Sequence, residues 1–168
     1  MALNWVMLDH EGRSPLPLPE EQVLCRVAKT SLQLEYDPQG LTYKAEGDAL
    51  ISSHRFVFIR QPQAAPRNSL LNSLSVPIDH FHSHKYVIPI FTAAYLQADV
   101  YSVAQGGLPE RQTGDEAYPV GKLKLWFMEA GGIAFRDAVD KAKKLWQERQ
   151  EAEQGRDALP AYEPPPEP

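Results

Sequence analysis

The sequence has only one cysteine, Cys25, among its 168 residues. A disulfide within the chain is therefore excluded, which fits a reducing compartment. No apolar run approaches the roughly 18 residues of a membrane-spanning helix. The mildly apolar start has no basic segment before it, so we also expect no signal peptide. Cys25 lies within an apolar run, where a thiol is expected as a small core or strand residue.

Positive charge is also scarce. The formal net charge is −5 and the isoelectric point is about 5.5. Direct nucleic-acid binding is therefore not expected, because it needs a basic face that neutralises phosphates. The acidic excess is concentrated in residues 151–168, which hold five acidic residues and one basic residue. The rest of the chain is nearly neutral, and its apolar content is sufficient for one domain with tails.

Motifs of known catalytic chemistry are missing. The sequence has no G-x-S-x-G, no Cys–His signature, no phosphate-binding loop and no H-E-x-x-H, so we expect neither an enzyme nor a cofactor. His80, His82 and His84 alternate, and on a regular strand they would share one face. That face is either a metal site or an ordinary polar surface. Alternate residues lie about 6–7 Å apart, which is wide for one tetrahedral ion, so we expect no metal.

The clearest fold signal is the stretch from Asp48 to Arg60. Two apolar runs, 49–51 and 56–59, flank the polar break Ser52-Ser53-His54-Arg55. Phenylalanine and β-branched residues favour strands, and the serines favour a turn, so the stretch predicts a β-hairpin. The second run is apolar at every position, which indicates a strand covered on both faces.

Further strand patterns precede and follow this hairpin, and one helix pattern comes last. The predicted strands include residues 23–27, 31–36, 74–78, 80–90, 94–103 and 122–128. From about 132 to about 152, apolar residues recur every three or four positions and predict an amphipathic helix. That stripe comprises Phe135, Ala138, Val139, Ala142, Leu145 and Trp146. The sequence thus predicts a mostly β fold of about seven strands, a barrel or sandwich, with one C-terminal α-helix.

Several segments, in their order, resemble the GRAM branch of the pleckstrin-homology-like fold, and more closely the WW-domain-binding protein 2 family. The hairpin I-S-S-H-R-F-V-F-I at 51–59 is similar to the GRAM pattern of an apolar residue, Ser or Thr, two variable residues, Arg and an apolar strand. The opening M-A-L-N, S-L-S-V-P-I at 73–78, F-T-A-A-Y-L-Q-A-D-V at 91–100 and K-L-K-L-W-F-M-E-A-G-G-I-A-F at 122–135 are also similar to the family. The resemblance implies a GRAM domain over 22–153. Pro15, Pro17 and Pro19 predict an extended lead-in over 1–21, and the short, proline-rich and polar end predicts a disordered tail over 154–168.

The tail contains the motif Leu159-Pro160-Ala161-Tyr162, a variant of the P-P-x-Y ligand of WW domains. A proline-fixed extended segment suits the aromatic groove of such a domain. The alternative is an inert acidic tail. The resemblance implies a non-enzymatic adaptor for WW-domain proteins, such as ubiquitin ligases or transcriptional co-regulators. It also implies transcriptional coactivation and a location in both cytoplasm and nucleus. The family's animal members carry several such motifs, whereas this chain carries one.

A second hypothesis is a phosphoinositide or membrane-binding module. Relatives of the pleckstrin-homology fold bind phosphoinositide head groups at the open end of the barrel, where basic residues gather. The alternative is ordinary solvated charge, and Arg55 has a structural alternative in the hairpin turn. The candidate lipid-binding residues are Lys29, Lys44, Arg55, Arg60, Arg67 and Lys85.

Overall fold

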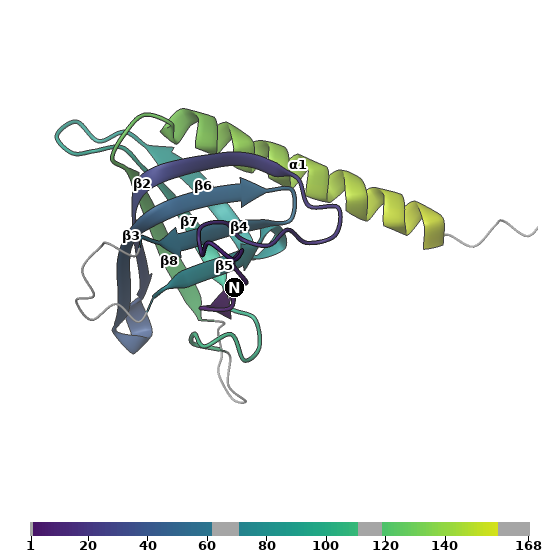
Figure 1. Ribbon diagram of the computed structural model, residues 1–168, viewed down its shortest axis with the longest axis horizontal. Helices are drawn as coiled ribbons and strands as arrows, with labels where there is room; N and C mark the ends of the chain where they lie inside the picture. Colours follow the sequence, from purple (N-terminus) through teal and green to yellow (C-terminus); the bar gives the residue numbers. More distant parts are fainter. Residues whose placement is uncertain (1, 62–70, 111–118, 158–168) are drawn as a thin grey trace, which may run out of the picture.

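The computed structural model describes residues 2–61, 71–110 and 119–157. The described residues form an eight-stranded antiparallel sheet that curls into a barrel, with one long helix laid against it (Figure 1). The predicted class, mostly β with one C-terminal helix, is confirmed. The elements are β1 (Ala2–Leu3), β2 (Val23–Tyr36), β3 (Leu41–Ser52), β4 (Arg55–Arg60), β5 (Ser73–Pro77), β6 (Phe81–Val87), β7 (Tyr95–Tyr101), β8 (Val120–Phe127) and α1 (Gly132–Asp157), with short 3₁₀ turns η1 (Asp37–Gln39) and η2 (Ile78–His80).

The sheet order is β1-β5-β4-β3-β2-β8-β7-β6, so β2 and β3 join the two halves of the barrel. The two strands predicted at 23–27 and 31–36 are one strand, β2, which bends at an irregularity between Val27 and Thr30. Lys29 has a φ of 54° within that irregularity. The bend lets the first part of β2 pair only with β3, while the second part also pairs with β8.

The predicted hairpin is confirmed as β3 and β4. Phe56 and Phe58 of β4 lie in the main core, and Val57 and Ile59 point the other way into a smaller cluster. Val6 and Leu8 of the N-terminal segment pack on that smaller cluster. Both faces of β4 are therefore covered, and the N-terminal segment covers the outer one.

The N-terminal segment also supplies the strand that raises the count from about seven to eight. Ala2 and Leu3 of β1 pair with Ser75 and Leu74 of β5. The amide of Leu3 donates to Gly106 O at 2.8 Å, and Leu8 forms a bridge with Pro15. Residues 2–21, expected as an extended lead-in, are thus tied to the barrel at several points.

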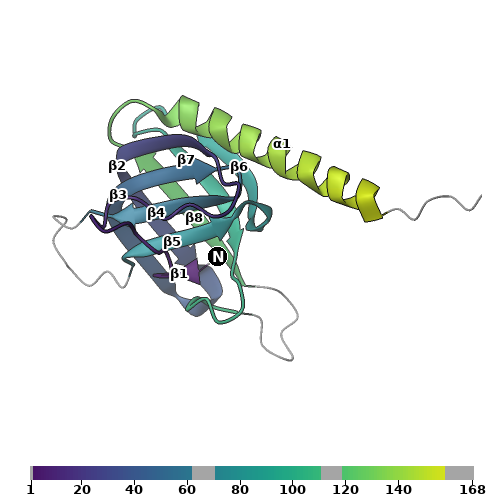
Figure 2. The same ribbon diagram turned by 45° about the vertical axis from the view of Figure 1, so that its right-hand side comes forward.

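Helix α1 packs its apolar stripe on the barrel, as its spacing predicts. Phe135, Ala138, Val139 and Ala142 are buried and Trp146 is half-buried against the same core. The helix ends at Asp157, later than expected, and its last residues, 151–156, are exposed as it runs past the barrel (Figure 2). None of the helices in the described ranges combines the length and apolar character needed to cross a bilayer.

Candidate functional site: a lysine row beside an apolar tip

Arg55, one of the candidate lipid-binding residues, is held inside the structure at the start of β4. Its side chain is only 11% exposed, and that of its partner Glu21 is 4% exposed. Arg55 Nε donates to Glu21 Oε1 at 2.9 Å, and Nη2 donates to Leu16 O at 2.8 Å. Ser52 Oγ donates to the same carboxylate at 2.6 Å. Arg55 therefore ties the N-terminal segment to the hairpin and is not available to a ligand.

These contacts lower the pKa of the Glu21 carboxyl. Burial alone would raise its pKa, but hydrogen bonds from Arg55, the Leu18 amide and Ser52 outweigh burial and hold the pKa of Glu21 below its ordinary value. A deprotonated carboxylate in this position accepts all of those hydrogen bonds at once.

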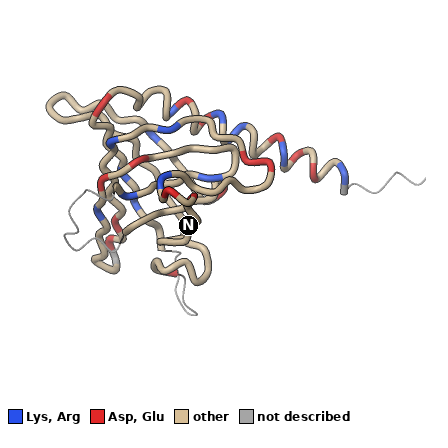
Figure 3. The backbone as a smooth tube through the Cα atoms, in the orientation of Figure 1, with Lys and Arg blue, Asp and Glu red and all other residues tan. Residues whose placement is uncertain are grey.

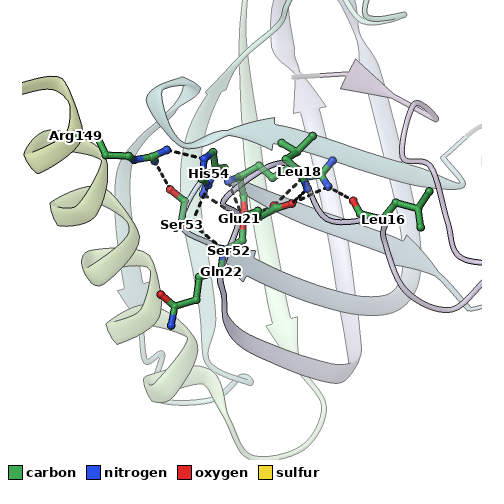
Figure 4. Close-up of polar contacts among 9 residues, drawn as sticks. Leu16, Leu18, Glu21, Gln22, Ser52, Ser53, His54 and Arg149 are labelled. Atoms are coloured by element: carbon green, nitrogen blue, oxygen red, sulfur yellow. Dashed lines mark hydrogen bonds and ion pairs between the residues drawn. The ribbon is translucent and has the colours of Figure 1, made fainter. Parts of the chain in front are cut away.

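Next to the Arg55–Glu21 pair, hydrogen bonds from Arg149 join helix α1 to the turn between β3 and β4. Arg149 Nη2 donates to Ser53 O at 2.5 Å, and Nη1 lies 2.7 Å from His54 Nε2 (Figure 4). Since a guanidinium can only donate, His54 Nε2 accepts, and His54 Nδ1 carries the proton toward Ser53 Oγ at 2.8 Å. Burial and the charge of Arg149 lower the pKa of His54. Arg149 Nε is buried without a hydrogen-bond partner among the described residues.

The outer face of the second half of the sheet carries a row of lysines and glutamines that crosses five strands. Cross-strand partners follow one another in register from β3 to β6, with each lysine separated from the next by one glutamine. The row is Lys44, Gln33, Lys124, Gln97 and Lys85, and we refer to it as the lysine row. Strands are about 4.8 Å apart, so successive lysines lie on strands roughly 10 Å apart.

The lysine row holds three lysines and no acidic residue, whereas the neighbouring row is mixed, and Gln33 of the lysine row donates a hydrogen bond to Glu35 of that neighbouring row. In that neighbouring row Lys122 Nζ pairs with Asp99 Oδ1 at 2.6 Å, which balances its charge. Lys124 Nζ lies 5.9 Å from the centre of the Tyr95 ring, a cation–π distance. Figure 3 shows both basic and acidic positions on the barrel and along α1.

One end of the barrel exposes an unusual group of large apolar side chains. Two segments provide them: the loop between β6 and β7, and the turn from β8 into α1. The side chains are Ile88 (72% exposed), Ile90 (89%), Phe91 (93%), Met128 (65%) and Ile133 (55%), and we call them the apolar tip. Figure 1 shows the β6–β7 loop projecting at the upper left, beside the loop that leads into α1. Residues 88–90, expected as part of a strand, instead lie in this loop, because β6 ends at Val87.

Between the two segments of the apolar tip lies a hollow of about 770 Å³, lined mainly by small residues such as Ala94, Gly131 and Ala134. A Cβ on Gly132 would lie 2.5 Å from Tyr86 Oη, so glycine lets the start of α1 approach β6 closely. A second pocket, of about 200 Å³, lies between α1 and η2, where Trp146 and Lys143 face Ile78 and Asp79.

Of the other candidate lipid-binding residues, Lys29 and Arg60 lie outside the lysine row. Lys29 pairs with Glu129 at the end that carries the apolar tip. Arg60 closes β4, where its amide donates to Asn72 O, and Arg67 lies outside the described residues. Of the six, Lys44 and Lys85 share the lysine row. Sequence reasoning missed Lys124, although the alternation Lys122-Leu123-Lys124-Leu125 placed it on the outer face of a strand.

The three alternating histidines do not share one face. The pairing of β6 with β7 is irregular between His82 and Lys85, and Ser83 has a φ of 50°. As a result, the His82 ring packs edge-on against Tyr101, whereas His84 Nε2 lies 2.5 Å from Asp140 of α1. Among the described residues, no three His, Cys, Asp or Glu side chains are placed to hold a metal ion.

The comparisons with known proteins show the fold. The chain is similar to a solved structure, the Vps36 N-terminal PH domain, with a TM-score of 0.57 and 16% sequence identity. The match covers 88% of this chain and 95% of that one. The chain therefore has a pleckstrin-homology-like fold. No family model and no curated protein sequence matches it. The WW-ligand motif, residues 159–162, lies outside the described residues.

Proposed function

We propose that the chain is a non-enzymatic adaptor that binds WW-domain proteins through Leu159-Pro160-Ala161-Tyr162. One observation supports this best. Helix α1 has 26 residues and is therefore about 39 Å long, and its exposed final turns run past the barrel to Asp157. The motif begins two residues later in the sequence. The described part of the chain thus ends away from the barrel, which supports the use of the residues that follow it as a ligand for a partner domain.

The motif chemistry suits a WW groove. Pro160 and Tyr162 are the anchors, and a short segment that becomes ordered on binding is expected to have micromolar affinity or weaker. The resemblance to the WW-domain-binding protein 2 family favours ubiquitin ligases or transcriptional co-regulators as partners. It likewise favours a role in transcriptional coactivation, in the cytoplasm and the nucleus.

The test is titration of a labelled peptide covering residues 155–168 against a panel of isolated WW domains. We expect saturable binding that Tyr162→Ala abolishes, since the substitution removes the aromatic anchor and its hydroxyl. Pro168→Ala, outside the motif, is the matched control and should bind normally. Phosphorylated Tyr162 should bind poorly because its charge would have to be desolvated. Equal binding of the Tyr162→Ala and unmodified peptides would overturn the proposal.

The lysine row favours a second function, attraction to anionic phospholipid. Lys44, Lys124 and Lys85 repeat at every second strand with only neutral glutamines between them. Such a row presents positive charge to a plane of phosphates, and its attraction should weaken as salt rises. Phosphoinositides, with their higher charge, are the strongest ligands expected of it.

Flotation of the full chain with phosphoinositide-containing vesicles tests this second function. Replacing Lys44, Lys85 and Lys124 with Gln should reduce binding several-fold at low salt. The matched control replaces three basic residues of α1, Lys141, Lys144 and Arg156, with Gln and should bind as the unmodified chain does. If both triple variants lost binding equally, net charge rather than the lysine row would be responsible.

A further inference from the structure

We infer that the apolar tip is a membrane-insertion site, which places Ile88, Ile90 and Phe91 in the interfacial layer of an anionic bilayer. The inference rests on the second proposed function, the attraction of the lysine row to phospholipid. It adds the part of the chain that enters the lipid and the orientation in which the barrel docks.

The first observation is exposure. Single exposed apolar residues are ordinary on protein surfaces, but contiguous groups mark interaction sites. Ile90 and Phe91 are adjacent and almost fully exposed, and Ile88 is two residues away. Met128, just after β8, and Ile133, in the first turn of α1, are also exposed at this end, where Glu129 and Asp137 line the hollow beside them. Five large apolar side chains thus gather at one end of the molecule.

The second observation is the order of side chains that leads from this end along the outer face of the sheet. Immediately inside the apolar tip, Tyr95 and Trp126 are cross-strand partners with ring centres 5.5 Å apart. Two residues further along the strands come Gln97 and Lys124 of the lysine row. With about 3.3 Å per residue, the lysine row lies roughly 7 Å behind the aromatic pair.

This order matches the layers of a bilayer surface. Aliphatic and phenylalanine side chains enter the boundary of the acyl region, tryptophan and tyrosine favour the interface, and lysines favour the phosphates. Lys124 and Lys85 have flexible stems that can reach a phosphate from a position beside the interface. The lysine row itself contains only lysines and glutamines, so its charge is complementary to an anionic lipid surface, and the nearest acidic contact on it is that of Gln33 with Glu35 of the neighbouring row.

The shape of the tip also favours lipid over a protein partner. The β6–β7 loop projects from the barrel (Figure 1, Figure 2), and the hollow described above lies between its end and the start of α1. A protrusion has little surface for a complementary protein but enters a fluid bilayer directly. Helix α1 starts at this tip and leads to the opposite side, so a docked barrel would direct the end of α1 away from the membrane.

The test uses the full chain and vesicles of phosphatidylcholine with about 30% phosphatidylserine, at low and high salt. We expect Ile90→Ser combined with Phe91→Ser to lower the partition coefficient on the order of 100-fold, because two large apolar side chains no longer leave water. The loss should persist at high salt. The matched control, Met7→Ser combined with Val23→Ser, removes two exposed apolar side chains elsewhere and should bind normally.

A depth measurement provides an independent readout. Phe91→Trp should be quenched by phospholipid brominated in its acyl chains, and Met7→Trp should show no added quenching over the native tryptophans. If the serine variant at the tip bound as the unmodified chain does while the lysine-row variant did not, insertion would be wrong and surface attraction would stand. If the unmodified chain bound neither these vesicles nor phosphoinositide vesicles, both proposals would fail.

Discussion

Arg149 and His54 are 95 positions apart in the chain, yet the Arg149 guanidinium lies 2.7 Å from the His54 imidazole. The same guanidinium donates to the carbonyl of Ser53. This contact fixes the second half of α1 to the β3–β4 turn, beyond the stretch where the apolar stripe holds it. It therefore sets the direction in which the end of the helix leaves the barrel.

Replacing Arg149 with Met should lower the free energy of unfolding by about 1–3 kcal/mol. The substitution keeps the length of the side chain but leaves the Ser53 carbonyl and the His54 ring without their donor. Arg156→Met, at an exposed position of the same helix, is the matched control and should have little effect. Urea unfolding followed by circular dichroism measures both. Equal stability of the two variants would contradict the role assigned to Arg149.

The same contact makes the stability depend on pH. The pKa of His54 is lowered in the folded chain, so below its ordinary value of 6.5 the unfolded chain binds a proton that the folded chain does not. The free energy of unfolding should therefore fall as pH drops below about 6.5. The charges of Glu20, Glu21, Arg55 and Arg149 also act on the ring.

This dependence can be separated from that of Glu21. The lowered pKa of Glu21 gives stability that is present above its ordinary value of 4.5 and is lost only at lower pH. Urea midpoints measured between pH 7.5 and 5.5 should thus decline in the unmodified chain and decline less in His54→Gln. A His54→Gln variant with the same decline would show that another group is responsible.

Gly47 lies where β3 bends past the end of β4, and no side chain fits there. A Cβ at Gly47 would lie 2.0 Å from Ile59 O and 2.8 Å from Arg60 Cα. Gly47→Ala should therefore cost more than about 3 kcal/mol of stability, because backbone must move. Gly155→Ala, in open space on α1, should instead stabilise by about 0.5–1 kcal/mol. Thermal melting of the two variants tests the contrast, and a mild effect at Gly47 would contradict it.

Val139 tests the docking of α1. Its side chain is fully buried among the core residues, next to Ala138 and Ala142 of the same helical stripe. Val139→Asp places a carboxylate there and should cost roughly 3–5 kcal/mol. Lys141→Asp introduces the same group on the exposed side of the helix and serves as control. If Val139→Asp melted within a degree or two of the control, the packing of α1 would be wrong.

Much of the fold could be predicted because it depends on local patterns. The apolar run 56–59, the polar break before it and the three-to-four spacing from Phe135 to Trp146 each encode one element. The irregularities at Lys29 and Ser83 could not be predicted, because the backbone of each residue has a positive φ, which nothing in the local sequence favours. The alternation of His82 and His84 indicated one shared face for the same reason. The pairing of β6 with β7 is irregular after His82, and His84 instead contacts Asp140 of α1.

The lysine row and the apolar tip depend on register and on strand ends. Lys44, Lys124 and Lys85 come from three strands, and only the pairing of five strands in register aligns them. Residues 86–91 have the composition of a strand. The sequence therefore did not indicate that the strand ends at Val87 and that the apolar residues after it are exposed. The charge of Arg55 suggested a ligand site, but its side chain pairs with Glu21 inside the structure. This pair could not be predicted, because Glu21 lies in a segment that the sequence predicted as an extended lead-in.

Co-flotation of a labelled WW domain with anionic vesicles measures whether this chain can join a lipid surface to a WW-domain protein. The WW domain should float with anionic vesicles only when the full chain is present. Tyr162→Ala should leave the chain on the vesicles and release the WW domain, whereas Ile90→Ser with Phe91→Ser should release both. A WW domain that stays in solution while the unmodified chain floats, at concentrations that saturate the tail peptide, would contradict the account.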